Sequence, residues 1–282
     1  MSLFYRKWKA SVTRRILVTV AVGMSVASVS LAETYRGHEA VSAYIDEVVA
    51  EHGFERSELE KWLNAAEKKQ SILDAMSRPA EKTKEWHEYR KIFVTKSRTE
   101  KGIKFWQENR ETLARAEREL GVPAEVIVAI IGVETRYGYF KGRYRVIDAL
   151  STLGFDYPRR AKFFKKELTH FFLLAREQNK DPMTLMGSYA GAMGYGQFMP
   201  SSYRAYAIDF DGDDFTDIWN NPIDAIGSVA NYMKRHGWRQ GDAVVSRLRV
   251  DATYDESLLG GSTKPRKTVA ELKQGGLRPV LE

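Results

Sequence analysis

An apolar run over residues 126–133 ends in a single carboxylate, Glu134. A helix over this stretch, with Pro123 in its first turn, would be apolar on all sides and therefore buried in the centre of a domain. Burial and the negative end of the helix dipole would both raise the pKa of Glu134. A carboxyl group that stays protonated near neutral pH can donate the proton that glycosidic bond cleavage requires. The alternative is a structural ion pair between Glu134 and Arg136.

A glycine-rich segment over residues 187–202 could bring the backbone close to a ligand. It has too many glycines for an ordinary helix and is too apolar for a linker. It is not a phosphate-binding loop, because the required lysine and the glycine spacing are both missing. Ser188, Tyr195 and Gln197 supply hydroxyl and amide groups suited to sugar hydroxyls and N-acetyl groups.

An acidic segment from Asp209 to Asp217 resembles the start of an EF-hand calcium loop. The match is incomplete, because Asp214 stands at the sixth position, where glycine is usual, and Asn220 stands at the twelfth. Five carboxylates this close together would repel one another strongly without a cation. The segment therefore predicts a calcium site, with an acidic surface loop as the alternative.

Two arginines, Arg159 and Arg160, follow Pro158 at the predicted start of a helix, where the helix dipole disfavours positive charge. An anionic group should compensate. Asp156 is the candidate within the chain, and an acidic group of a substrate is the functional candidate.

The elements that must position these residues are mainly helical. Residues 33–118 carry apolar stripes at helical spacing, which predict an amphipathic bundle with its stripes packed inward. Pro79 separates the first pair of helices, and Gly121 ends the last. Tyr89 belongs to one stripe but has basic neighbours, so it is also a candidate for a surface cleft. The three stripes are Leu59-Trp62-Leu63-Ala66, Trp86-Tyr89-Phe93 and Ile103-Trp106-Leu113-Ala116-Leu120.

Further helices are predicted to begin at Pro158 and at Pro222, the second ending before Gly237. Beyond Trp238 the pattern changes. Residues 243–250 predict a strand, and residues 268–274 predict a short helix.

The first 32 residues have the pattern of a signal peptide. A basic segment without acids precedes an apolar stretch over residues 16–31, and Ser30-Leu31-Ala32 fits a signal-peptidase site. The general secretory route is favoured over the twin-arginine route, which Arg14-Arg15 resembles only weakly. A retained membrane anchor is the alternative reading.

Composition excludes some functions. Five positive charges lie in the predicted signal peptide, and subtracting them from the formal net charge of +7 leaves +2, which gives no support for nucleic-acid binding. The chain has no cysteine, so disulfides, cysteine-ligated metals and a lipid-modified cysteine are excluded.

Taken in order, these motifs resemble the lytic murein transglycosylase B family, glycoside hydrolase family 103. The resemblance covers roughly residues 41–238 and rests on four segments. They are Gly132-Val133-Glu134-Thr135-Arg136, Asp156-Tyr157-Pro158-Arg159-Arg160, Gly191 to Tyr203, and the loop that begins at Asp209.

The resemblance implies cleavage of the β-1,4 bond between N-acetylmuramic acid and N-acetylglucosamine in peptidoglycan. The product is a 1,6-anhydromuramic end, formed without water. Glu134 matches the single family carboxyl group that acts as acid and then as base. No cofactor is required for this chemistry, and the implied partner is the glycan strand.

Other roles are carried over from the family in the same way. Ser188, Gln197, Tyr195, Tyr89 and Tyr232 match sugar-contacting or groove positions. Arg159 and Arg160 match basic groove residues that face the acidic muramoyl-peptide side. The metal positions are the side chains of Asp209, Asp211 and Asp213, the backbone carbonyl of Phe215, and Asp224, which is displaced by one extra residue.

The implied fold is mainly α, with a lysozyme-like core, an N-terminal helical domain and a small, incomplete β region. The expected division is a signal peptide (1–32), a helical domain (33–120), the catalytic core (121–238, with the calcium loop at 209–224), and the start of a β domain (239–282). Family members continue further, so we expect a truncated chain or a fragment.

The expected location is the periplasm of a Gram-negative bacterium, in a soluble or signal-anchored form rather than as a lipoprotein. We expect a monomer, with other cell-wall enzymes as possible partners. Two functional alternatives stay open: a hydrolytic muramidase that uses the same glutamate with water, and an inactive peptidoglycan-binding fragment.

Overall fold

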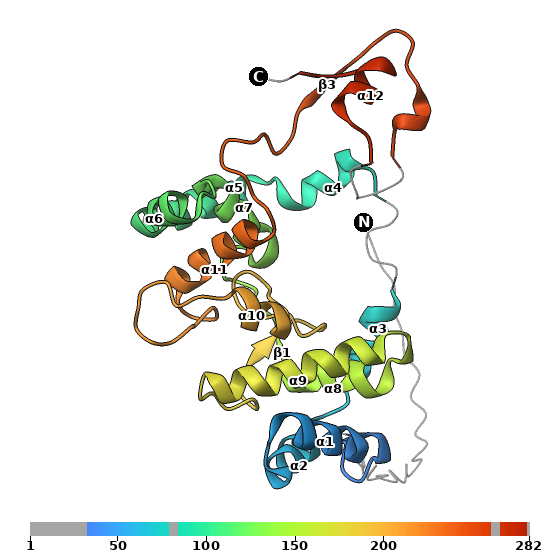
Figure 1. The fold of residues 1–282 in the computed structure, drawn as a ribbon, viewed down its shortest axis with the longest axis vertical. Coiled ribbons are helices and arrows are strands. Elements are labelled where there is room, and N and C mark those ends of the chain that lie inside the picture. The colour runs from blue at the N-terminus through green and yellow to red at the C-terminus, as the bar shows by residue number, and fades with distance from the viewer. Residues whose placement is uncertain (1–32, 79–83, 261–265, 281–282) are drawn as a thin grey trace, which may run out of the picture. The chain divides into compact units, whose positions relative to one another are not determined.

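The computed structural model describes residues 33–78, 84–260 and 266–280. The predictions for the signal peptide and for Pro79 lie outside these residues. The described chain is mainly helical, as predicted, with two short two-stranded sheets (Figure 1). No described helix combines the length and the apolar character needed to cross a membrane.

Helices account for most of the elements. They are α1 (Glu39–His52), α2 (Arg56–Ala65), α3 (Gln70–Ser77), α4 (Trp86–Phe93), α5 (Lys96–Glu108), α6 (Arg110–Leu120), α7 (Ala124–Thr135), α8 (Val146–Asp156), α9 (Ala161–Glu177), α10 (Pro200–Tyr206), α11 (Pro222–Arg235) and α12 (Val269–Gln274), with 3-10 turns η1 (Pro158–Arg160) and η2 (Glu256–Leu258). The strands are β1 (Tyr144–Arg145), β2 (Met186–Gly187), β3 (Arg247–Val250) and β4 (Leu277–Val280).

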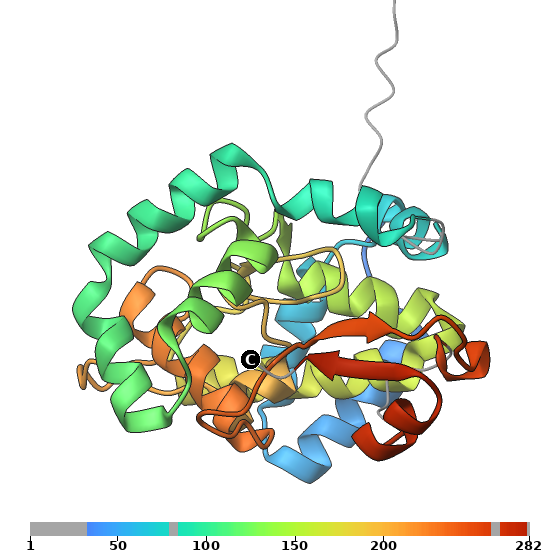
Figure 2. The same cartoon turned by 90° about the horizontal axis from the view of Figure 1, so that it is seen from above.

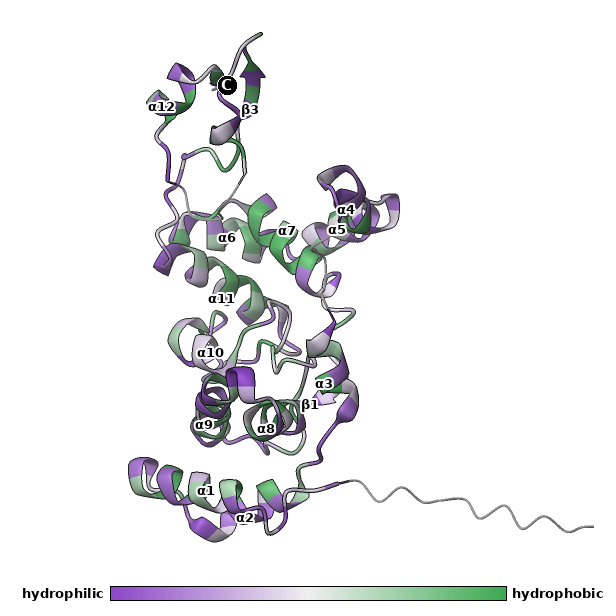
Figure 3. Ribbon diagram, turned by 90° about the vertical axis from the view of Figure 1, so that its right-hand side faces the viewer, coloured by the Kyte–Doolittle hydropathy of each residue, from purple (hydrophilic) through white to green (hydrophobic). Residues whose placement is uncertain are grey.

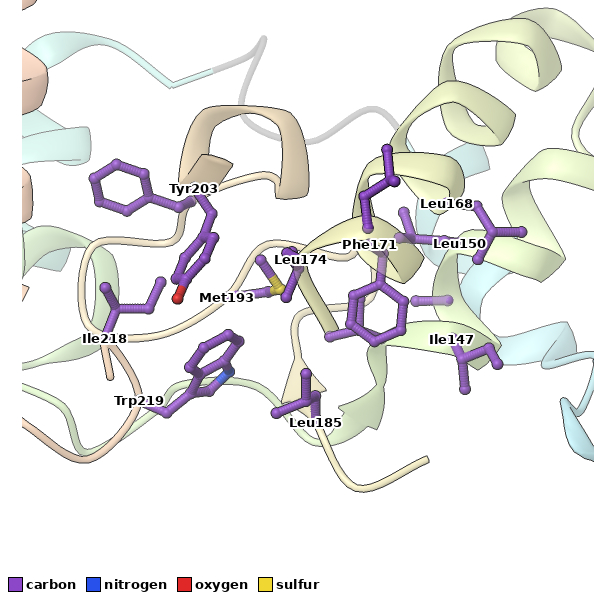
Figure 4. Close-up of a cluster of buried hydrophobic side chains, with 14 of the residues drawn as sticks. Ile147, Leu150, Leu168, Phe171, Leu174, Leu185, Met193, Tyr203, Ile218 and Trp219 are labelled. Carbon is purple, nitrogen blue, oxygen red and sulfur yellow. The ribbon is translucent and has the colours of Figure 1, made fainter. Parts of the chain in front are cut away.

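The core is built where α8 packs along α9 and the glycine-rich segment crosses beside them. Figure 4 shows Leu150 of α8 and Phe171 of α9 near Met193 of that segment. All three side chains are fully buried. Met193 also pairs with Phe198 in an antiparallel bridge, so the segment folds back on itself rather than forming a helix, as its glycine content predicts.

Helix α7 contacts α5, α6 and α11, and Figure 3 shows it as one of the most apolar helices. Ile127 and Ile131 are fully buried. The prediction that this helix is buried on every side was wrong, because Ala129 is exposed and Val133 is 47% exposed. The helix is apolar all round in sequence, yet Ala129 and Val133 reach solvent, and Ile130 and Glu134 line a pocket.

The three predicted stripes have different outcomes. Leu59 and Leu63 of α2 are fully buried, as predicted. The stripe on α4 is not packed inward, because no residue of that helix is buried and Trp86 is 72% exposed. The third stripe is divided at Asn109, which ends α5 and begins α6. Leu113 and Ala116 of its α6 part are fully buried and Leu120 is half-buried, whereas Ile103 of α5 is exposed.

The last described region is a small β unit. Strands β3 and β4 pair antiparallel, as Figure 2 shows in red. Their register runs from Arg247↔Val280 to Val250↔Leu277. The predicted strand over 243–250 begins later, at Arg247, and its partner β4 was not predicted. Helix α12 is confirmed, with Thr268 and Glu271 forming a capping box at its N-terminus.

Candidate active site

Glu134 lines a pocket of about 290 Å³ between α7, α10, α11 and the glycine-rich segment. Of the described residues that line it, only Glu134 carries a carboxylate. The rest of the lining is largely apolar, with an amide and two hydroxyl groups among it. The lining residues are Ile130, Glu134, Gly196, Gln197, Phe198, Met199, Ser202, Val229, Tyr232 and Met233.

The Glu134 carboxylate forms no salt bridge and no side-chain hydrogen bond with any residue of the described chain. The guanidinium group of Arg136 lies over the ring of Phe140 instead, 5.1 Å from its centroid. The alternative of a structural Glu134–Arg136 pair was therefore wrong. Although part of the side chain reaches solvent, burial against the pocket wall raises the pKa of Glu134.

The end of α7 is held by contacts that fix the direction of Glu134. Arg98 of α5 donates a hydrogen bond of 2.8 Å to the Gly132 carbonyl oxygen, which also accepts the backbone N–H of Arg136 at 3.2 Å at the end of the helix. Tyr137 has a left-handed backbone (φ 63°). Its ring packs against Gly102 and Gly132, where an added Cβ would lie about 2.5 Å from the Tyr137 hydroxyl oxygen. Both glycines therefore make room for this ring.

Thr135 connects the end of α7 to the glycine-rich segment. Its Oγ1 accepts a hydrogen bond from the Gly138 backbone N–H at 2.9 Å and lies 3.0 Å from the Tyr195 carbonyl oxygen. Thr135 is fully buried. This contact couples the position of Glu134 to the segment that supplies the opposite wall of the pocket.

Gln197, predicted as a sugar contact, does line the Glu134 pocket. Its backbone is left-handed, with φ of 52°, which costs free energy for a residue other than glycine. Its Nε2 donates a hydrogen bond of 3.0 Å to the Gly194 carbonyl oxygen. The amide plane is therefore fixed before any ligand binds.

Tyr232 also lines this pocket, and its ring is held on several sides. It stacks on His236 with 4.0 Å between centroids and meets Phe198 and Tyr206 edge to face. A rigid aromatic side chain of this kind offers a face to a sugar at low cost in conformational entropy.

The other predicted contacts lie outside the lining of the Glu134 pocket. Ser188 lines a neighbouring cavity, and its hydroxyl oxygen accepts backbone N–H groups of Ala190 and Ala192. Tyr195 packs near Phe105 and under the Lys141 ammonium group. Tyr89 lies on α4, in ring contact with Trp86 and Phe93.

Arg159 and Arg160 lie in η1, just before α9 begins, so the predicted helix starts slightly later than expected. Asp156 is not their partner, because its carboxylate accepts a hydrogen bond from Tyr35 at 2.7 Å and pairs with Lys68 at 3.0 Å. The Arg160 guanidinium lies over Phe163, 4.2 Å from the ring centroid. Neither arginine forms a salt bridge within the described residues.

Several residues of the pocket were not predicted as site residues. Ser202 and Met199 flank Pro200, and Met233 follows Tyr232. Ser202 and Met199 belong to the glycine-rich motif, so their place in that motif could have indicated that they line the pocket. Nothing in the sequence distinguished Met233 or Val229 from ordinary core positions of α11.

The acidic loop is compact. One carboxylate oxygen from each of Asp209, Asp211 and Asp213 lies within 4.8 Å of the others. Burial tends to raise the pKa of Asp209, but backbone N–H groups, chiefly those of Gly212 and Asp214, lower it overall. Asp214, at the usual glycine position, adopts φ of 69°, so aspartate supplies the left-handed turn here. The donor set suits a hard cation such as Ca²⁺.

Asp224 lies outside this cluster of three carboxylates. It is fully buried, and its two oxygens accept backbone N–H groups of Phe210 at 2.8 Å and Asp217 at 2.7 Å. It therefore holds the two ends of the loop together. The Phe215 side chain is exposed, and its backbone N–H bonds to Asp213.

Fold and site together define a lysozyme-like helical protein with a single carboxyl group in a partly apolar pocket. The chain belongs to the family described as Transglycosylase SLT domain, which matches residues 37–282.

Two solved structures support this assignment. The soluble lytic transglycosylase SltB1 from Pseudomonas aeruginosa is 54% identical, with a TM-score of 0.83 over 86% of this chain and 82% of that one. The Escherichia coli lytic transglycosylase Slt35, solved in complex with calcium, is 43% identical, with a TM-score of 0.81 over 89% of this chain and 79% of that one.

A curated relative gives the same result. Membrane-bound lytic murein transglycosylase B of Escherichia coli (strain K12) is 46% identical over 245 residues. The alignment covers 84% of this chain but only 66% of that protein.

Proposed function

We propose that this chain is a peptidoglycan lytic transglycosylase that cleaves the β-1,4 bond between N-acetylmuramic acid and N-acetylglucosamine and leaves a 1,6-anhydromuramic end. The observation that carries the proposal is Glu134. It is the only carboxylate among the residues lining its pocket, it has no ion-pair partner in the described chain, and burial raises its pKa. A glycosidase with a carboxylate nucleophile would need a second carboxyl group about 5 Å away.

One carboxyl group is sufficient for both proton transfers of the reaction. Protonated Glu134 donates its proton to the glycosidic oxygen, and the bond from that oxygen to C1 of the muramic residue breaks. The resulting carboxylate then takes the proton of the C6 hydroxyl group, whose oxygen bonds to C1. Glu134 is protonated again, and no water is consumed. A raised pKa suits a group that serves as both acid and base near the working pH.

The contacts around the sugar are assigned by pocket position. Gln197 and Tyr232 bind the sugar beside Glu134, with Ser202 as an additional hydroxyl group. We retain Ser188, Tyr195 and Tyr89 as contacts further along the strand. Arg159 and Arg160 are retained as sites for acidic groups, which fits their lack of salt bridges within the described chain.

A structural Ca²⁺ is proposed for the acidic loop, held by Asp209, Asp211 and Asp213, with Phe215 contributing its carbonyl oxygen. The convergence of three carboxylates supports it. The ion would neutralise their repulsion and order the loop, and the transglycosylase chemistry itself needs no cofactor. Asp224 would act indirectly, through the two backbone N–H groups that it already binds.

The remaining expectations are proposals of the same kind. The protein works in the periplasm on glycan strands, after export directed by residues 1–32, and without a lipid-modified cysteine. Its helical region (33–120) and core (121–238) form the binding groove, and residues 239–282 contribute the β region. The protein acts as a monomer.

Product analysis tests the function. Purified sacculi are digested with the parent protein and with Glu134→Gln, and the released muropeptides are analysed by mass spectrometry. We expect anhydromuramic ends from the parent and almost none from the variant. Reducing muramic ends without the anhydro form would identify a hydrolytic muramidase. Binding without product from either protein would identify an inactive binding protein.

A further inference from the structure

Glu167 of α9 is a buried carboxylate that the proposed mechanism does not use. It is 4% exposed, and no cation among the described residues forms a salt bridge with it. Its two oxygens instead accept hydrogen bonds from one residue of α10: the Ser201 backbone N–H at 2.9 Å and the Ser201 hydroxyl group at 2.7 Å. Burial of a carboxylate costs free energy unless hydrogen bonds replace its hydration. The contact with Ser201 provides that replacement.

Ser201 lies in the first turn of α10, where backbone N–H groups have no partner within the helix. The N-cap residue is Met199, whose side chain has no oxygen that could accept such a group. Pro200 follows and has no N–H. Glu167 therefore supplies from a neighbouring helix the acceptor that the N-cap residue lacks. Its negative charge also lies at the positive end of the helix dipole.

The start of α10 forms part of the Glu134 pocket, because Met199 and Ser202 both line it. A serine or aspartate at position 199 would cap the helix, but it would replace an apolar side chain in the pocket wall. Since α10 has only seven residues, its conformation depends on contacts with other elements. The position of Met199 and Ser202 therefore depends on what holds the first turn of α10.

Helix α9 holds α10 at two places. Figures 1 and 3 show α10 between α9 and α11, and it packs on both. Besides the contact at Glu167, the Arg204 guanidinium donates hydrogen bonds of 2.6–3.1 Å to the Glu177 carboxylate near the other end of α10. Glu177 and Arg204 are exposed, and neither lines the Glu134 pocket. An exposed ion pair of this kind contributes little to stability.

We propose that Glu167 is a positioning residue, which caps α10 and thereby holds Met199 and Ser202 against the sugar beside Glu134. The inference rests on the proposed function and adds to it a side chain that does not line the pocket itself. The competing explanation is a purely structural role, in which Glu167 stabilises the fold without affecting how the pocket binds sugar.

The experiment compares the two glutamates of α9 that hold α10. Glu167→Ala removes the buried acceptor, and the matched control Glu177→Ala removes the exposed one. Affinity for an N-acetylglucosaminyl-N-acetylmuramyl tetrasaccharide is measured by calorimetry in the Glu134→Gln background, well below the midpoint of each thermal melt. We expect about tenfold weaker binding in Glu167→Ala, equal to about 1.4 kcal/mol, and less than a twofold change in Glu177→Ala.

Two milder variants test the same contact with less risk to folding. Glu167→Gln keeps an amide oxygen for the Ser201 N–H and an amide group that can donate to the Ser201 hydroxyl oxygen, so it should recover most of the affinity. Ser201→Ala removes only the hydroxyl bond and should weaken binding by about threefold. Parent affinity in both Glu167→Ala and Ser201→Ala would identify a purely structural role, and equal losses in Glu167→Ala and Glu177→Ala would also overturn the inference.

Hydrogen exchange of the α10 backbone amides tests the capping without any substrate. Exchange at Ser201, Ser202 and Tyr203 should be faster in Glu167→Ala than in Glu177→Ala, because the first turn loses its acceptor. Equal exchange rates in the two variants would overturn the positioning role whatever the enzyme does. A parent protein that releases no anhydro ends from sacculi would instead refute the proposed function, and the exchange result would still decide whether Glu167 holds α10.

Discussion

The Glu134 pocket and the Asp209 loop each contain a carboxyl group with a shifted pKa, but the two shifts have opposite directions. Glu134 stands alone among mainly apolar side chains, and burial raises its pKa. Asp209 stands with two other carboxylates at the surface, and backbone N–H groups lower its pKa overall in spite of burial. The first environment favours the protonated acid, and the second favours the anion.

The difference shows that chemistry follows from environment rather than from residue type. A carboxyl group that can hold a proton is suited to proton transfer, whereas carboxylates that stay ionised side by side are suited to a cation. Glutamate and aspartate have similar intrinsic pKa values. The packing around each group therefore decides which role it can play.

Both sites are held by left-handed backbone next to the functional side chains. Arg136 and Tyr137 have positive φ just after Glu134, and Gly212 and Asp214 have positive φ inside the acidic loop. Polar side chains support both sites: Arg98 donates to the Gly132 carbonyl oxygen, and Asp224 accepts two backbone N–H groups. A left-handed backbone costs free energy at residues other than glycine, and it persists only where surrounding contacts hold it in place.

The largest expected difference between the two sites is in activity. Glu134→Gln should lower the rate of anhydro-end formation by about 10²–10⁴-fold, because it removes general acid–base catalysis. Asp211→Asn, at saturating Ca²⁺, should change the rate much less. Rates are measured on purified sacculi, with thermal melts to verify folding. Comparable losses in the two variants would mean that the acidic loop takes part in turnover.

The next difference is in the response to calcium. Ca²⁺ should stabilise the parent and Glu134→Gln alike, by about 2.7 kcal/mol at one hundred times the dissociation constant. The double variant Asp211→Asn/Asp213→Asn should lose this gain. Thermal unfolding with Ca²⁺ and with a chelator provides the measurement. A full calcium shift in the double variant would place the ion elsewhere.

Much of this fold could be predicted from sequence periodicity and local motifs. Pro222 and Gly237 correctly bounded α11, and Thr268 with Glu271 gave α12 its capping box. The stripe on α4 predicted inward packing, but Trp86 is exposed. Spacing identifies one face of a helix but does not reveal whether another element covers it.

The site was predictable only in part for the same reason. The apolar run before Glu134 indicated a raised pKa, and Gln197 and Tyr232 do share its pocket. Asp224 was predicted as a metal ligand, but its carboxylate accepts two backbone N–H groups instead. These contacts depend on how the chain folds, which no local sequence pattern encodes. The spacing of Met233 on α11 likewise predicts a core position, and only the packing of α11 against α7 shows that it lines the pocket.

A third comparison concerns the glycines that support each site. Gly132→Ala should cost about 1–3 kcal/mol, because the new Cβ would overlap the Tyr137 ring and the core must shift. Gly212→Ala should cost about 1 kcal/mol, because its Cβ meets open space and only the positive φ is strained. Denaturant unfolding measures both. Gly132→Ala should also reduce activity, whereas Gly212→Ala should leave activity unchanged at saturating Ca²⁺. A larger loss of activity in Gly212→Ala than in Gly132→Ala would contradict this account of how each carboxylate is positioned.

The smallest expected effect is the pH dependence of stability, and the two sites should differ in its sign. The folded-state pKa of Glu134 is raised above its usual value of 4.5, so its contribution to stability is fully present below that value and is lost as pH rises through the folded pKa. The folded-state pKa of Asp209 is lowered below 3.8, so its contribution is present above that value and is lost as pH falls. The free energy of unfolding of the parent minus that of Glu134→Gln should therefore decrease from pH 4 to pH 8. The same difference for Asp209→Asn, measured in chelator, should decrease from pH 5 to pH 2. Slopes of the same sign in both series would show that the two carboxyl groups are not in opposite environments.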